Sequence, residues 1–206
     1  MSPVTAAEVA LALLAVFGLL GFAWRAWLQH RRTGSTGFRG ISGAIGSVEW
    51  IAAVGFAVAL AVAVVGPLLQ LSGTIAPLPG LQVGGIQIAG IALALLGIVL
   101  TVWAQLDMGD SWRVGVDASE TTALVHTGMF GRVRNPIYTA MLTFNFGMAL
   151  LTPNLVTIAG LILAVTALQL QVRQVEEPYL RDKHGTAYRD YTSSVGRFVP
   201  GVGLIR

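Results

Sequence analysis

The residues best suited to chemistry in this chain begin with Arg134-Asn135-Pro136. Asparagine is a favoured N-cap and proline a favoured first helical residue, so the sequence predicts that a helix starts here. The unpaired N–H groups and positive dipole end of such a helix attract anions, and Arg134 adds a cation beside them. The segment is therefore a candidate site for a carboxylate or a phosphate. The alternative is that it only caps a helix.

A second group of charged residues lies nearer the C-terminus. Arg173 stands three and four residues before Glu176 and Glu177, so all three side chains can share one face of a helix. Two adjacent carboxylates at the end of an apolar segment need a cationic partner, either Arg173 or a ligand. Pro178 predicts a kink immediately after them. The segment is a candidate cation site, and the alternative is a surface ion pair.

These two segments flank long stretches without charge. Residues 50–106 and 135–172 hold no Asp, Glu, Lys or Arg, and charged residues make up only 11% of the chain. A soluble domain is about a quarter charged, and ~20 apolar residues suffice to cross a bilayer. We therefore expect an all-α polytopic membrane protein with one domain, 1–206. Residues 1–106 would hold three N-terminal spans, and 107–206 would hold the candidate site and a short helical C-terminal segment.

Five membrane-spanning helices are expected. They cover about 6–27, 48–71, 86–106, 136–151 and 154–172. Thr152-Pro153-Asn154 predicts a tight turn, which makes the last two spans a helical hairpin. Every Lys and Arg falls on one side of this arrangement, so the positive-inside rule predicts an outer N-terminus and a cytoplasmic C-terminus. Both candidate segments then lie at the cytoplasmic end of the hairpin, as neighbours in space.

An anion site next to carboxylates suits a zwitterion such as S-adenosylmethionine, which carries a carboxylate, an ammonium and a sulfonium. From about residue 124 to 200 the chain resembles the isoprenylcysteine carboxyl methyltransferase family and, more broadly, the membrane methyltransferases that include phospholipid methyltransferases. The motifs that carry this resemblance are Gly128-x-Phe130-x-x-x-Arg134-Asn135-Pro136-x-Tyr138, Arg173-x-x-Glu176-Glu177-x-x-Leu180, His184-Gly185-x-x-Tyr188-x-x-Tyr191 and Arg197-Phe198-x-Pro200. The family usually has histidine where this chain has Asn135, which does not titrate near neutrality.

The resemblance implies a methyltransferase that uses S-adenosylmethionine and a lipophilic acceptor entering laterally from the membrane. It implies that the cofactor is bound by Val125, Gly128, Arg134, Asn135, Pro136, Tyr138, Glu176 and Glu177. Arg173 and Glu177 would be catalytic, and Arg173 would bind an acceptor carboxylate, which needs no general base. An amine, phenol or hydroxyl acceptor would need a proton acceptor, and Glu177, His126 and Tyr188 are the candidates.

Residues 107–117 are rich in glycine and acidic residues and contain Trp112 and Arg113. Both side chains are candidates for binding the substrate. The alternative is a polar loop at the membrane surface, with Trp112 in the aromatic belt.

Other compositional features limit the function. The chain has no cysteine, and its three histidines are far apart, so we expect no metal site. The net charge of +3 comes from arginines that flank spans, which argues against a nucleic-acid partner. The excess of arginine over lysine is typical of a GC-rich bacterial genome and hence of an inner-membrane protein. Two alternatives remain: an NADPH-dependent reductase of the sterol or steroid type, and a non-catalytic scaffold or transporter.

Overall fold

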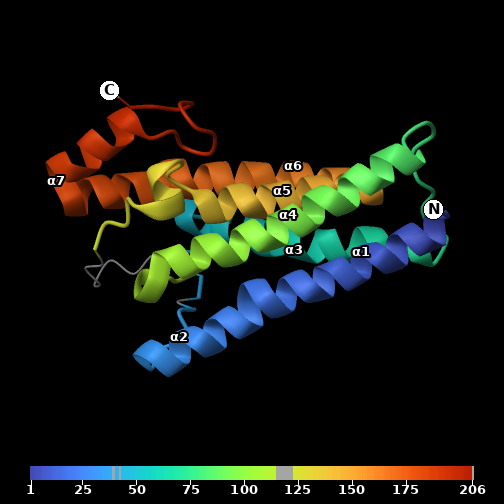
Figure 1. Cartoon of the computed structure of the whole chain (residues 1–206), viewed down its shortest axis with the longest axis horizontal. Coiled ribbons are helices and arrows are strands. Elements are labelled where there is room, and N and C mark those ends of the chain that lie inside the picture. Colours follow the sequence, from blue (N-terminus) through green and yellow to red (C-terminus); the bar gives the residue numbers. More distant parts are fainter. Residues whose placement is uncertain (39, 42, 115–122, 206) are drawn as a thin grey trace.

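The computed structural model describes residues 1–38, 40, 41, 43–114 and 123–205. Within these residues the chain forms helices and loops, with isolated β-bridges but no strand. The long helices run side by side along one axis (Figure 1). Four helical stretches are long and apolar enough to cross a membrane, and a fifth apolar helix is shorter. This confirms the predicted all-α polytopic class.

The helical elements follow one another with short connections. They are α1 (Pro3–Gly18), η1 (Leu19–Trp24), α2 (Arg25–Thr33), α3 (Val48–Leu71), α4 (Gly84–Met108), η2 (Gly109–Ser111), η3 (Gly128–Gly131), α5 (Pro136–Leu151), α6 (Leu155–Leu170), η4 (Gln171–Glu176) and α7 (Glu177–Ser194). The elements η1 and η4 are π-helical, and each joins its neighbours into one continuous helix. α3 and α5 begin and end where the sequence predicted.

Small residues bring α4 and α5 close together. A Cβ atom on Gly97 would lie 2.5 Å from the backbone nitrogen of Phe144, and one on Gly147 would lie 2.5 Å from that of Ala94. Close approach of this kind is how membrane helices gain packing energy without a hydrophobic driving force between them. Phe17 of α1 stacks on Phe144 with ring centroids 4.2 Å apart. The seam therefore fixes α5, whose first turn carries candidate site residues.

The predicted tight turn between α5 and α6 is present. The backbone N–H of Asn154 donates to the carbonyl of Thr152 at 2.8 Å. The side chain of Asn154 then caps α6, because its Oδ1 accepts the N–H of Thr157 at 2.9 Å. α5 and α6 consequently run antiparallel, and the start of α5 lies beside the end of α6 (Figure 1).

The bend near the C-terminus is not at Pro178, as the sequence suggested, but at Gly185. Proline lacks an N–H and its ring clashes with the carbonyl of the preceding α-helical turn. The wider π-helical turn η4 comes immediately before α7, and Pro178 occupies the first turn of α7 without breaking the helix. At Gly185 φ is +52°, a conformation that favours glycine. Beyond it the second leg of α7 folds back towards α5 (Figure 1).

Candidate functional site

A cavity of about 580 Å³ opens at the end of the bundle that carries the C-terminus. That size is typical of small-molecule sites. One side of the cavity, here called the polar side, is lined by Arg113, Asn135, Tyr138, Gln171, Glu176 and Tyr179. The opposite side, here called the apolar side, is lined by Phe22, Ala53, Phe56, Ala57, Trp112, Met141 and Leu168. The site can thus receive a polar and an apolar group together.

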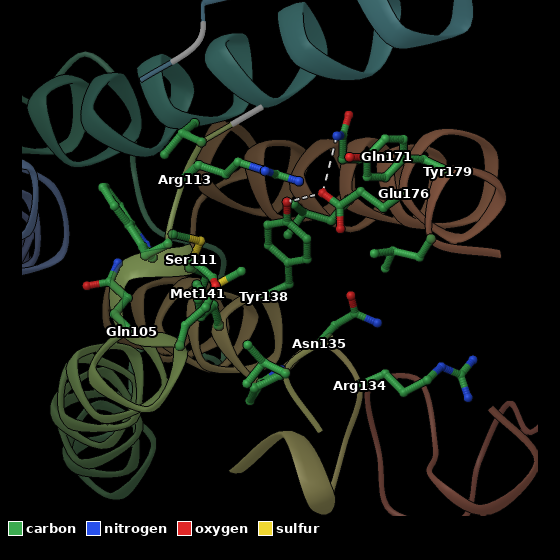
Figure 2. Close-up of a pocket in the computed structure, with 18 of the residues that line it drawn as sticks. Gln105, Ser111, Arg113, Arg134, Asn135, Tyr138, Met141, Gln171, Glu176 and Tyr179 are labelled. Carbon is green, nitrogen blue, oxygen red and sulfur yellow. Dashed lines mark hydrogen bonds between the residues drawn. The ribbon is translucent and has the colours of Figure 1, made fainter. Parts of the chain in front are cut away.

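Glu176 is at the centre of the polar side. Its Oε1 accepts a hydrogen bond from the hydroxyl of Tyr138 at 2.5 Å and another from Nε2 of Gln171 at 3.2 Å. Among the described residues, its Oε2 accepts no hydrogen bond. Figure 2 shows the side chain of Arg113 pointing towards Glu176. A carboxylate held by neutral donors on one oxygen keeps the other oxygen for a ligand.

Glu177, the next residue, is bound on both oxygens. Arg197 donates from Nε to Oε1 at 2.7 Å and from Nη2 to Oε2 at 2.9 Å. Arg134 donates from Nη2 to Oε1 at 2.9 Å. The hydrogen bonds to Glu177 raise the pKa of Arg197, so this arginine stays charged at any physiological pH. Buried between two guanidinium groups, Glu177 serves the protein's own structure.

Arg134 and Glu177 are neighbours, as predicted from the hairpin, but Arg134 does not act as a free cation. Its guanidinium also donates to the carbonyls of Thr192, Val195 and Gly203. A guanidinium only 6% exposed needs acceptors for its N–H groups, and the C-terminal segment supplies them. The proposed anion-binding role of Arg134 is therefore corrected: Arg134 holds the C-terminal segment over the start of α5, and in Figure 2 it points away from Tyr138.

The start of α5 lies where the sequence placed it. Asn135 occupies the N-cap position and Pro136 the first helical position. The side chain of Asn135 does not cap the helix, however, because its Nδ2 donates to the carbonyl of Arg197 at 3.0 Å. Pro136 and Tyr138 line the cavity, so the positive end of the α5 dipole faces it.

Arg173 is not part of the site. Its side chain is exposed and donates to Oε1 of Gln169 at 2.8 Å, and it does not line the cavity. The sequence argument assumed α-helical spacing, in which residues three and four apart share a face. Arg173 lies within the π-helical η4, whose turns hold more residues, so Arg173 and Glu176 face different sides.

The remaining predicted residues divide between the cavity and its support. Val125, Trp112 and Arg113 line the cavity. Gly128 does not; its φ of +60° and lack of a Cβ let η3 pack on Asp107, whose Oδ2 accepts the N–H of Met129 at 2.8 Å. Residues 115–117, the end of the predicted loop, lie outside the described residues.

Sequence reasoning missed Gln171 and the apolar side. Ala53, Phe56 and Ala57 follow helical spacing along one face of α3. Because α3 is apolar all around, that spacing has no polar contrast that would reveal which face lines a cavity. Gln171, the last polar residue before the acidic pair, was the one available signal.

Residues 86–187 match the family model of the phospholipid methyltransferases. The match covers just under half of the chain, from α4 into α7, and includes the polar side of the cavity. The fold is similar to that of a eukaryotic intramembrane Ras methyltransferase, an isoprenylcysteine carboxyl methyltransferase, with a TM-score of 0.68 at 20% sequence identity; the alignment covers 99% of this chain and 69% of that one. No curated protein matches the sequence. The resemblance to membrane methyltransferases is confirmed, and it supports a membrane methyltransferase here.

Proposed function

We propose that this protein transfers a methyl group from S-adenosylmethionine to a lipophilic acceptor. The observation that carries the proposal is the pairing of Glu176 with Arg113 across the polar side of a cavity whose other side is apolar. The family match over residues 86–187 supports the same reaction class. The charge distribution further supports a site at the cytoplasmic end of the bundle, in a bacterial inner membrane.

The residues of the polar side fit the cofactor's charges. Oε2 of Glu176, which accepts no hydrogen bond among the described residues, suits the ammonium group. Arg113 suits the carboxylate group. Val125 and the turn at Pro136 and Tyr138 would contact the adenosine part. Arg134 and Glu177 bind no ligand in this proposal but hold the C-terminal segment in place above the site.

The apolar side suits the hydrocarbon part of an acceptor. S-adenosylmethionine supplies a methyl group already activated by its sulfonium, so the protein's task is to align the acceptor and exclude water. Trp112 and Met141 would position the acceptor, and Arg113 is close enough to the polar side to bind an acceptor carboxylate. For an acceptor that must lose a proton, Glu177 is unsuitable because both arginines hold it, and exposed His126 is outside the cavity wall. Tyr188 lines the cavity.

The NADPH-dependent alternative requires cations for a 2′-phosphate. In the described part of the cavity wall the arginines are Arg113 and Arg134, and Arg134 is already bound by Glu177 and backbone carbonyls. The arrangement therefore favours the methyltransferase over the reductase.

The test compares ligands on the purified protein in detergent. S-adenosylhomocysteine should raise the thermal midpoint, NADPH should not, and Glu176→Gln should abolish the increase. Glu8→Gln, the same change at an exposed residue of α1, is the matched control. A shift with NADPH alone would support the reductase, and no shift with either ligand would support a scaffold. Tritiated S-adenosylmethionine, incubated with farnesoic acid, farnesol or phosphatidylethanolamine in vesicles, then tests whether a carboxylate, hydroxyl or amine accepts the methyl group.

A further inference from the structure

A third arginine is buried near the cavity, outside the polar side. Arg25 follows directly on the π-helical η1, and its side chain is only 1% exposed. Charged residues within membrane helices are costly and usually serve a function. Neither the sequence motifs nor the proposed cofactor contacts use Arg25, so its burial requires another explanation.

The contacts of Arg25 are few. Its guanidinium stacks over the ring of Trp112, 4.7 Å from the centroid, and Nη2 donates to the carbonyl of Gly109 at 2.5 Å. Within the described residues, Nε and Nη1 have no hydrogen-bond partner. A buried arginine with two unsatisfied donors is a poor choice for stability alone. Its main neighbour is the indole ring of Trp112.

The same helix holds the end of α4 at further points. Gln29, one turn after Arg25, donates from Nε2 to the carbonyl of Asp110 at 2.7 Å. Gln105 of α4 donates from Nε2 to the carbonyl of Gly21, within η1, at 2.8 Å. η1 and α2 therefore fix the short turn that leads into Trp112. π-Helical turns of this kind are common at functional sites.

Trp112 is held on its other side as well. A Cβ atom on Gly37 would lie 2.8 Å from the indole, so only glycine allows this approach. The ring of Phe38 meets Trp112 edge-on, with centroids 6.2 Å apart. The indole is thus fixed between Arg25 and the loop before α3, and it lines the cavity. Its position sets the width of the apolar side.

We propose that Arg25 is a positioning residue that shapes the acceptor part of the cavity by holding Trp112 in the cavity wall. The catalytic part of this inference rests on the proposed methyltransferase function; the structural part does not. Lysine in place of Arg25 keeps the charge but loses the planar group that stacks on the indole. Trp112 would then be free to change rotamer and alter the space offered to an acceptor.

The first test is spectroscopic and independent of activity. Trp24, Trp27, Trp50 and Trp103 are replaced by phenylalanine, so that Trp112 is the only fluorophore. Arg25→Lys should shift its emission to longer wavelength and increase quenching by acrylamide. Arg31→Lys on the same helix is the control, because Arg31 stacks on Trp27, which does not line the cavity. Unchanged emission and quenching in Arg25→Lys would overturn the proposal.

The second test is a double-mutant cycle in the protein with all its tryptophans. With whichever of the three probe acceptors is methylated, Arg25→Lys and Trp112→Phe should each lower kcat/KM about tenfold, as expected for loss of a buried cation–π contact. The double variant should be no worse than Trp112→Phe, and S-adenosylhomocysteine affinity should be unchanged in all three. Multiplying effects would show that Arg25 acts independently of Trp112. If the unaltered protein methylates no probe, the proposed function fails, while the fluorescence test still decides the role of Arg25.

Discussion

The Arg134–Glu177–Arg197 cluster and the polar side of the cavity contain adjacent glutamates in opposite states. Glu177 has three charge-assisted hydrogen bonds that occupy both oxygens. Glu176 has neutral donors on one oxygen and faces a cavity with the other. A buried charge that the protein satisfies completely stabilises the fold, whereas one that it satisfies in part is available to a ligand. The comparison separates a structural carboxylate from a binding carboxylate one residue away.

The largest effect is expected at the cluster. Glu177→Gln leaves two guanidinium groups, one of them buried, without a counter-ion. The free energy of unfolding should fall by about 3–5 kcal/mol, the usual result of removing one partner of a buried ion pair. Urea unfolding of the detergent-solubilised protein measures it. A variant as stable as the unaltered protein, with weaker cofactor binding, would reverse the roles of the two glutamates.

A smaller loss of stability is expected from Arg197→Gln. Arg197 is partly exposed, with 13% of its side chain accessible, and Glu177 would keep its bond to Arg134. The free energy of unfolding should fall by ~1.5–3 kcal/mol, the range for a hydrogen bond to a charged group. The same unfolding experiment ranks it against Glu177→Gln, and a loss equal to that variant would mean that Arg134 contributes little.

Glu176→Gln should affect binding and leave stability almost unchanged. The amide keeps the hydrogen bonds from Tyr138 and Gln171 but loses the charge that attracts an ammonium group. Affinity for S-adenosylhomocysteine should fall about 10- to 100-fold, equivalent to ~1.5–3 kcal/mol. Isothermal titration calorimetry measures this, with Glu8→Gln as the control. Unchanged affinity would remove Glu176 from the proposed site.

The smallest effect is expected for Arg173→Ala. The side chain is exposed and pairs with Gln169, so the free energy of unfolding should change by less than about 0.5 kcal/mol. Methyl transfer should also be unchanged, contrary to the expectation from the motif alone. A clear loss of turnover with normal cofactor binding would restore the catalytic role that the sequence suggested for Arg173.

The sequence was sufficient for the membrane helices and for the meeting of their ends. Hydropathy located α3 and α5, and the tight turn at Pro153 placed Arg134 near Glu177. It could not distinguish Glu176 from Glu177, because the partner that decides between them, Arg197, is brought in by a bend at Gly185. Nor could it predict that η4 is π-helical, which moves Arg173 off the expected face. Tertiary contacts determine both features.

The two π-helical turns make the site sensitive to chain length. Each residue of an α-helix turns the chain by about 100°, so removing one residue from η4 and restoring α-helical winding would rotate everything after it by that amount. Glu176 would leave the cavity and Glu177 its arginines, although every side chain would still be present. The same holds for η1, where one deletion would turn Arg25 away from Trp112. Descendants of this protein can therefore vary the residue types of these turns more freely than their number.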